Sequence, residues 1–343
     1  MFGYRIHDWG TAPRWEEISD PVVGPGEVAI DVEACGVGLT VLNCIDGDLA
    51  DDSALLPRAP GHELVGRVTE VGAGASGDLI GRRVVAYFYL ICGVCPSCVA
   101  GREPWCEKLQ GWVGVHRDGG YAPHVVLPAR NALPIPDELD PVQATVVPDA
   151  VATPVHVAAR AGIEETDRVV VIGAGGGIGI HMIQVAGYSG ASVAGFDVGG
   201  DKLAAVEQHG AVPFDSSDFS GIDAHRLLPG GPPTVIVDLI GTTESTRWSL
   251  EALDMGGRLV ALTTFRDRPQ KFESRQLVFR EAAVLGSRYA TRAQVTQAAE
   301  LVAGGAITPV IGAVAAPEGV LDIHEQLTEG TLIGRGAIDW RRT

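Results

Sequence analysis

Short apolar runs that alternate with polar positions dominate the first 150 residues and predict β-strands. The runs span residues 27–35, 63–72, 82–90 and 121–128, and glycines and prolines separate them. Apolar side chains at alternate positions, such as Val28, Ile30 and Val32, are typical of a strand that buries one face. We therefore expect a β-rich domain over residues 1–150.

Between residues 151 and 285, strand-like runs alternate with helical runs. Runs 168–174, 191–197, 234–241 and 258–265 have the pattern of buried strands, and 179–190, 201–210 and 245–257 have that of helices. Such alternation indicates βαβ units around a parallel sheet, as in a Rossmann domain. Residues 286–343 contain one clear amphipathic helix, expected over 292–305. The fold class is therefore α/β.

Charge and hydropathy exclude several classes of partner. The 343 residues include 43 acidic and 26 basic side chains, for a net charge of −17. This balance argues against binding to nucleic acid or to anionic membrane surfaces. The segment 169–196 lacks charged residues, but its glycines argue against a membrane span. The N-terminus shows no apolar signal segment. We expect a cytoplasmic protein.

Four cysteines within fifteen residues form the strongest chemical signal in the chain. They are Cys92, Cys95, Cys98 and Cys106, with spacing C-x2-C-x2-C-x7-C. Zinc prefers tetrahedral thiolate coordination, and four thiolates leave no open position for a substrate. Disulfides are the first alternative and disagree with a cytoplasmic chain. An iron–sulfur cluster is the second. The spacing favours one structural zinc.

A glycine turn between an apolar run and a helical run predicts a dinucleotide site. Glycine is needed where a pyrophosphate approaches the backbone and the helix N-terminus. Asp197 ends the next apolar run, where a carboxylate would bind the adenosine ribose and repel a 2′-phosphate. The pattern favours NAD(H) over NADP(H), against the alternative of a turn used for packing. The predicted cofactor residues here are Gly173, Gly176, Gly177, Ile178, Gly179, Asp197 and Lys202.

His62 and Glu63 lie in a Pro-Gly-rich turn just before a predicted strand. Alone, such a pair is more often a hydrogen-bonded turn than a metal site. The other segments change this interpretation, because together they resemble the zinc-containing alcohol dehydrogenases of the medium-chain dehydrogenase/reductase superfamily. The resemblance covers nearly the whole chain, from "PGEVAIDVEACGVGL" through the GHE turn, the cysteine segment and the glycine turn to "LIGRGAIDW".

The resemblance implies a GroES-like catalytic domain built from residues 1–150 and 286–343, with a Rossmann domain inserted over residues 151–285. It also implies a small-molecule substrate and a homodimer or homotetramer, with Rossmann sheets paired through 257–265 and 282–289. The implied roles are catalytic zinc ligands at His62, Glu63 and Asp149, a proton-relaying hydroxyl at Thr40, a nicotinamide contact at Thr153 and a pyrophosphate contact at Arg335.

The chain departs from the family pattern at the position of the first catalytic zinc ligand. Family members usually have a cysteine there, and this chain has Gly38. Leu39, Val41 and Asn43 also replace polar residues of the pattern. Cys35 and Cys44 flank this segment, and neither stands at the ligand position. We interpret both as ordinary buried cysteines. Leu39, Phe88 and Trp112 are candidates for the substrate pocket or for the core.

The lost ligand leaves two mechanisms open. In the first, zinc bound by His62, Glu63 and Asp149 polarises the oxygen of an alcohol or carbonyl substrate. In the second, no catalytic metal is present, and the enzyme reduces a conjugated C=C or C=N bond by orientation and proton donation. We favour an NAD(H)-dependent oxidoreductase acting on an alcohol/carbonyl pair with a weakened zinc site. A non-catalytic NAD-binding protein is a third alternative.

Overall fold

The computed structural model describes residues 1–262 and 269–342 and divides into two compact units. Unit 1 comprises Met1–Ala152, Ala290–Gly305 and Ile311–Thr343, and unit 2 comprises Thr153–Tyr289 and Ala306–Val310. The sequence placed all of 286–343 with the first domain. The structure instead gives residues 286–289 and 306–310 to unit 2. Residues 263–265 of the predicted pairing strand lie outside the described residues.

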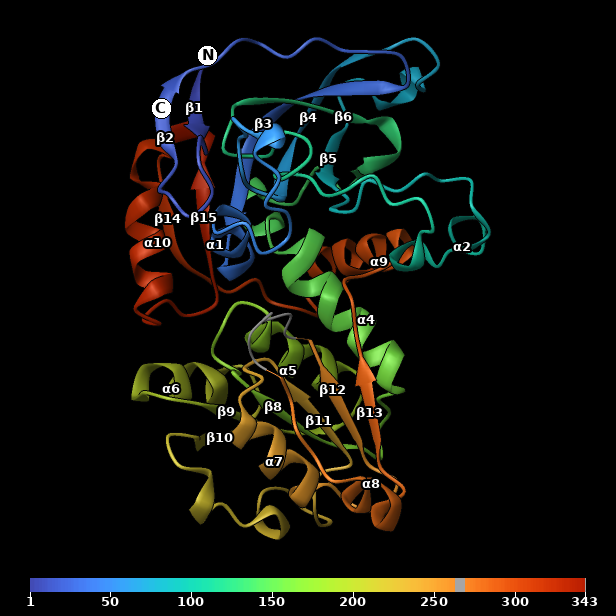
Figure 1. The fold of residues 1–343 in the computed structure, drawn as a ribbon, viewed down its shortest axis with the longest axis vertical. Coiled ribbons are helices and arrows are strands. Elements are labelled where there is room, and N and C mark those ends of the chain that lie inside the picture. The colour runs from blue at the N-terminus through green and yellow to red at the C-terminus, as the bar shows by residue number, and fades with distance from the viewer. Residues whose placement is uncertain (263–268, 343) are drawn as a thin grey trace. The chain divides into compact units, whose positions relative to one another are not determined.

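Unit 1 is built on a mixed sheet with strand order β14-β15-β3-β4-β5-β7, and β6 pairs with β3 (Figure 1). β1 and β2 form a separate antiparallel pair. The strands are β1 (Phe2–Arg5), β2 (Arg14–Glu17), β3 (Glu27–Val37), β4 (Glu63–Val71), β5 (Arg83–Ala86), β6 (His124–Pro128), β7 (Ala132–Pro134), β14 (Ile311–Ala315) and β15 (Arg335–Asp339).

Strand β3 is central in this sheet, and its alternation follows the sequence prediction. Val28, Ile30 and Val32 are buried, whereas Asp31 is exposed. The helices of unit 1 are α1 (Leu39–Ile45), α2 (Pro96–Val99), α3 (Pro141–Ala144), α9 (Arg292–Ala303) and α10 (Val320–Thr328). A π-helical turn over Val147–Val151 precedes α4 (Ala152–Ala161). Such turns often occur at functional sites.

Unit 2 is a six-stranded parallel sheet with strand order β10-β9-β8-β11-β12-β13. This is the doubly wound dinucleotide-binding order, with its switch point between β8 and β11. The strands are β8 (Arg168–Ile172), β9 (Ser192–Asp197), β10 (Val212–Asp215), β11 (Val235–Asp238), β12 (Arg258–Ala261) and β13 (Ala283–Gly286). The helices that follow β8 are α5 (Gly179–Tyr188), α6 (Gly200–Gln208), α7 (Thr243–Ala252) and α8 (Ser274–Arg280).

Each face of the unit 2 sheet has its own core. One cluster contains Val169, Val171 and Ile183, and the other contains Val170, Ile172 and Trp248. Successive residues of β8 point to opposite faces, so a strand covered on both faces must be apolar throughout. This explains the unbroken apolar run of β8. Within the described residues, no helix is long and apolar enough to cross a bilayer.

Candidate active site

The glycine turn of unit 2 joins β8 to α5 at the switch point of the sheet. Gly173 has φ +85°, a conformation that glycine adopts without strain. A Cβ on Gly179 would overlap the carbonyl oxygen of Gly173, so α5 approaches β8 closely only because residue 179 is glycine. The turn is therefore shaped as a backbone cradle before a helix N-terminus, and its residues fit a dinucleotide pyrophosphate.

Asp197 ends β9 beside this turn and fixes its shape. Its Oδ2 accepts a hydrogen bond from the Gly175 N–H at 2.7 Å, and its Oδ1 accepts one from the Val198 N–H at 2.8 Å. Lys202 on α6 lies 3.7 Å from the same carboxylate. The predicted residues Gly173, Gly176, Gly179, Asp197 and Lys202 thus belong to one neighbourhood of unit 2.

His181 is a positioning residue that the sequence argument missed. Its Nε2 accepts a hydrogen bond from the Val310 N–H at 3.1 Å, so the proton lies on Nδ1. Nδ1 then donates to the carbonyl oxygen of Gly177 at 2.7 Å. The imidazole therefore ties the glycine turn to the returning segment Ala306–Val310. The available signal was a histidine four residues after Gly177 of the turn, on a helix without charged residues.

The four cysteines of unit 1 converge as their spacing predicts. Their sulfur atoms all lie within 4.8 Å of one another, with Cys92 Sγ 3.6 Å from Cys106 Sγ and 4.0 Å from Cys98 Sγ. Sulfurs bound at about 2.3 Å to one tetrahedral zinc are about 3.8 Å apart. Backbone N–H groups, led by that of Val94, lower the pKa of Cys92 to about 6, whereas burial raises that of Cys98 to about 12. The four residues fit a zinc ion, whose charge would hold all four as thiolates.

A second cluster in unit 1 contains His62, Glu63 and Asp149, all buried. Their ligand atoms lie within 4.8 Å of one another, and His62 Nε2 is 3.4 Å from Asp149 Oδ2. Glu63 Oε1 accepts a hydrogen bond from the Ala150 N–H at 3.1 Å, and its Oε2 is buried without a hydrogen-bond partner in the described chain. Burial raises the pKa of Glu63. The spacing of these three ligand atoms, taken alone, would suit a metal ion.

Arg335 places a positive charge in the same cluster. Its side chain is 5% exposed, and its Nε donates to Glu63 Oε1 at 3.2 Å. Its Nη2 donates to Asp149 Oδ2, also at 3.2 Å. A guanidinium that hydrogen-bonds both carboxylates repels a divalent cation and occupies its donor atoms. The arrangement seen here therefore does not fit a catalytic zinc. That Arg335 contacts the pyrophosphate stays a prediction.

Two glycines, Gly36 in β3 and Gly38 just after it, leave room for this cluster: Gly36 for the Glu63 side chain and Gly38 for Arg335. Residues 36 and 38 are two apart, so their side-chain directions coincide. Gly36 pairs with Glu63 across the sheet, and a Cβ on Gly36 would lie 2.6 Å from Glu63 Oε2. Gly336 pairs with Val37 in the antiparallel β15–β3 ladder, which sets Arg335 beside Gly38. A Cβ on Gly38 would overlap Arg335 Nη1.

Cys35 and Cys44 are both free and buried, which confirms the prediction for these residues. Burial raises the pKa of the Cys35 thiol well above its usual value and that of Cys44 to about 12. Among the described residues, neither sulfur belongs to a group of side chains spaced to hold a metal ion. Neither therefore replaces the ligand lost at Gly38.

The remaining predicted residues are distributed over both units. Thr40 is the second residue of α1 and is half-buried, and Thr153 lies buried in α4 of unit 2. Phe88 packs on His62, with ring centroids 4.4 Å apart. Leu39 is 55% exposed, and Trp112 packs edge-on against Tyr89. Phe88 is therefore the wall candidate that contacts the cluster.

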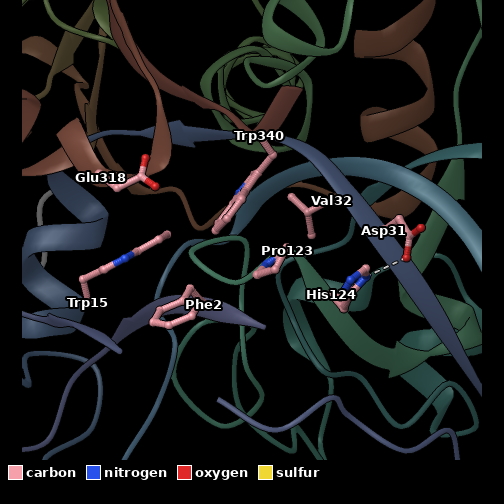
Figure 2. A pocket seen from close by; sticks show the side chains of 8 residues that line it. All are labelled: Phe2, Trp15, Asp31, Val32, Pro123, His124, Glu318 and Trp340. Carbon is pink, nitrogen blue, oxygen red and sulfur yellow. Dashed lines mark hydrogen bonds and ion pairs between the residues drawn. The ribbon is translucent and has the colours of Figure 1, made fainter. Parts of the chain in front are cut away.

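A separate cavity of about 580 Å³ opens elsewhere in unit 1. Figure 2 shows Phe2, Trp15 and Trp340 along one side of it and the hydrogen-bonded pair His124 and Asp31 on the other. Trp15 stacks on both Phe2 and Trp340, with centroids 6.2 Å apart in each pair. The predicted catalytic and cofactor residues do not line this cavity, so it is not the candidate active site.

Comparison with known proteins agrees with both units. Residues 24–137 match the alcohol dehydrogenase GroES-like domain, and residues 177–304 match the zinc-binding dehydrogenase domain. These two domains define the class of zinc-binding dehydrogenases. An alcohol dehydrogenase from Moraxella sp. (strain TAE123) is 30% identical over 339 residues, 98% of each chain.

Two further relatives extend the comparison. The acryloyl-coenzyme A reductase of Metallosphaera sedula is 29% identical over 321 residues, which cover 93% of this chain and 94% of that one. The crystal structure of an NAD-dependent alcohol dehydrogenase superposes with a TM-score of 0.90 at 26% identity, covering 99% of each chain. This chain therefore belongs to the zinc-containing alcohol dehydrogenase family of the medium-chain dehydrogenase/reductase superfamily.

Membership confirms the predicted combination of a GroES-like domain and a Rossmann domain. It also confirms that the chain is an alcohol dehydrogenase-like oxidoreductase. The third alternative, a non-catalytic NAD-binding protein, is therefore not supported by these relatives, which are named as dehydrogenases and reductases. The candidate site departs from the family pattern at Gly38, where a Cβ would overlap Arg335 Nη1.

Proposed function

We propose that this protein is an NAD(H)-dependent oxidoreductase that interconverts an alcohol and a carbonyl compound. The observation that carries the cofactor assignment is Asp197, a carboxylate at the end of β9 beside the glycine turn. A carboxylate there accepts hydrogen bonds from the ribose hydroxyls and repels a 2′-phosphate. When bound, the nicotinamide supplies or accepts the hydride. The NAD-dependent relative supports the same cofactor.

The residues of unit 1 supply the polar groups for an oxygen-bearing substrate. His62 and Asp149 lie in contact, and Arg335 keeps the carboxylates of Glu63 and Asp149 paired in a buried setting. Hydrogen-bond donors fixed in such a setting stabilise developing negative charge without reorganising. Thr40, by its place at the start of α1, is proposed to pass the substrate proton toward solvent.

Reduction of a conjugated C=C bond is the second candidate function. Arg335 is the observation that favours it, because its guanidinium pairs with the carboxylates of Glu63 and Asp149 and so disfavours zinc binding there. The acryloyl-coenzyme A reductases among the relatives reduce a bond of this kind by name. The substrate class would then be a conjugated carbonyl compound such as an enoyl thioester. The substrates of both candidate functions contain a carbonyl oxygen, which the site must bind.

Turnover assays distinguish the two candidates. NADH oxidation is measured with a panel of aldehydes and ketones and with a matched panel of enals and enoyl thioesters, in each case with and without a chelator. Faster turnover of saturated carbonyls supports the first function, and turnover confined to conjugated acceptors supports the second. Failure to oxidise NADH with either panel contradicts both.

Replacement of Asp197 by asparagine is expected to weaken discrimination between NADH and NADPH. The amide oxygen can still accept the Gly175 N–H, but the charge that repels a 2′-phosphate is removed. Hydrogen bonds to charged groups exceed those to neutral groups by about 1 kcal/mol, so the ratio of kcat/KM values for NADH over NADPH should fall roughly fivefold. The exposed Asp201, on the same helix as Lys202, provides the control Asp201→Asn. An unchanged ratio in Asp197→Asn contradicts the ribose assignment.

We propose that Cys92, Cys95, Cys98 and Cys106 hold one structural zinc. Elemental analysis of protein purified without added metal or chelator should give one zinc per chain. The variant Cys95→Ser should lose it and unfold at a lower temperature, because a structural zinc contributes directly to folding. Cys44→Ala, which alters a buried thiol outside the cluster, should retain it. Zinc bound equally by both variants would refute the assignment.

We also propose a cytoplasmic homodimer or homotetramer. Six free cysteines in the described chain suit a reducing compartment. In unit 2, β13 is the last strand of the sheet order and Val284 is 38% exposed, which supports pairing of two sheets through this edge. Light scattering of the purified protein measures the number of chains.

A further inference from the structure

The cavity of about 580 Å³ in unit 1 combines aromatic rings with negative charge. Volumes of roughly 300–1,000 Å³ are typical of small-molecule sites. Among the described residues, no lysine or arginine lines the cavity. The aromatic and polar side chains in its lining are three rings, two carboxylates and one imidazole: Phe2, Trp15, Trp340, Asp31, Glu318 and His124.

The aromatic wall of the cavity, formed by Phe2, Trp15 and Trp340, comes from the two ends of the chain. In the β1–β2 pair, Tyr4 lies opposite Trp15, and Phe2 is two residues from Tyr4, so all three side chains lie on one face. Trp340 follows β15, and its Nε1 donates a hydrogen bond to the carbonyl oxygen of Gly120 at 2.9 Å, which fixes the indole. The stacked pairs have centroids 6.2 Å apart. Rings at this separation are offset, so each leaves part of a face for another group.

Glu318 places a carboxylate beside this wall. The Tyr4 hydroxyl donates to the carbonyl oxygen of Glu318 at 2.8 Å, and the Tyr4 ring packs on Trp15 with centroids 5.1 Å apart. Figure 2 shows Glu318 on the side of the cavity where the two tryptophans lie. Within the described residues, its carboxylate makes no hydrogen bond or ion pair. The negative charge of Glu318 is therefore available to a ligand.

Asp31 supplies a second carboxylate, on the other side of the cavity. Its Oδ1 is 2.7 Å from His124 Nδ1 and 3.5 Å from Thr69 Oγ1. In the part of the chain that the structure describes, its Oδ2 makes no hydrogen bond. A protonated His124 offsets one of the two negative charges and a neutral His124 offsets neither. The lining therefore stays negative in both states of the histidine.

We propose that this cavity binds a small organic ammonium ion, which contacts the aromatic wall and is attracted by the carboxylates of Glu318 and Asp31. A cation is attracted to the negative face of an aromatic ring, most strongly to that of tryptophan. The carboxylates repel an anion and do not attract a neutral ligand. A metal ion needs several ligand atoms around one point. Among the described residues, the groups spaced in this way do not include Asp31, His124 or Glu318. The inference goes beyond the proposed function, because the predicted catalytic and cofactor residues do not line this cavity.

Two probes of nearly the same shape test for a cation site. Tetramethylammonium carries a positive charge, whereas tert-butanol is neutral, and neither can be oxidised to a carbonyl compound. Each probe is titrated with the protein, and the NMR signal of its methyl protons gives the dissociation constant. We expect tetramethylammonium to bind saturably and roughly 5- to 30-fold more tightly than tert-butanol, because only the cation is attracted by the rings and the carboxylates.

Two variants with matched controls locate the bound cation. Trp15→Leu removes one ring of the aromatic wall and should weaken tetramethylammonium binding roughly 2- to 30-fold. Its control is Trp105→Leu, at a tryptophan that is 55% exposed and does not line the cavity. Glu318→Gln removes a charge at an exposed position and should weaken binding about two- to fivefold. Glu329→Gln makes the same change at an exposed residue outside the lining and should bind as wild type does.

Weaker binding of tetramethylammonium by Trp15→Leu and Glu318→Gln, with both controls unchanged, supports the proposal. Absence of saturable binding, equal binding of the two probes, or binding that neither variant weakens overturns it. Circular dichroism shows whether Trp15→Leu folds, and if it does not, Glu318→Gln and the comparison of probes decide. These measurements need no turnover, so a failure of the proposed function in the NADH oxidation assays leaves this inference standing.

Discussion

Replacing Arg335 by methionine is expected to lower the free energy of unfolding by about 3–5 kcal/mol. The change leaves the carboxylates of Glu63 and Asp149 buried without the guanidinium that pairs with both. Breaking a buried ion pair from one side is costly because the remaining charge keeps its desolvation penalty. Urea denaturation at neutral pH, followed by circular dichroism, measures the loss.

Arg341→Met is the matched control for Arg335→Met. Arg341 also pairs with two carboxylates, those of Asp339 and Asp140, but its side chain is 44% exposed. Exposed pairs contribute about 0–1 kcal/mol, so this variant should unfold close to wild type. Adding Glu63→Gln to Arg335→Met should recover part of the lost stability, because one buried charge is removed. Equal stability of the two methionine variants would contradict the buried pairing.

Gly179→Ala is expected to weaken NADH binding roughly 5- to 150-fold. The new Cβ overlaps the carbonyl oxygen of Gly173, a backbone atom that cannot rotate away. Either the turn or α5 must shift, and overpacking of this kind costs about 1–3 kcal/mol. If the shift distorts the turn in the NADH complex, this free energy is lost from binding and the affinity for NADH falls by the factor given above. Fluorescence titration of NADH measures the change.

Gly187→Ala separates this steric effect from a general effect of alanine in α5. A Cβ on Gly187 meets nothing within 4 Å, and the residue lies in the same helix. Alanine is favoured over glycine inside a helix by about 0.5–1 kcal/mol, so this variant should bind NADH normally and be slightly more stable. If both alanine variants bind NADH as wild type does, the close approach at Gly179 is not needed.

Local sequence patterns predicted the elements whose neighbours in space are neighbours in the chain. The run over 168–174, the helical run over 179–190 and the run over 191–197 became β8, α5 and β9 nearly as predicted. The cysteines lie within fifteen residues, so their spacing alone brings the sulfurs together. Such features depend on short-range geometry, which periodicity and turn residues specify.

The position of Arg335 could not be predicted in this way. Its contact with Glu63 joins residues 272 apart in the chain and depends on the register of β15 against β3. The resemblance assigned Arg335 only to the pyrophosphate. A family pattern matches positions along the chain, and it does not say which groups a side chain contacts. The usable signal was the pair Gly36 and Gly38, which removes two side chains on one side of the extended chain at the end of β3.

The pairing of β15 with β3 has a consequence for how the protein is made. Residues 335–339 leave the ribosome about 300 residues after β3, at a translation rate of about 5–20 residues per second. During this interval of about 15–60 seconds, residues 34–37 of β3 lack their β15 partner, and Glu63 and Asp149 lack their cation. Unit 1 therefore cannot complete its sheet until the end of the chain is made, whereas the nearly contiguous unit 2 can fold beforehand.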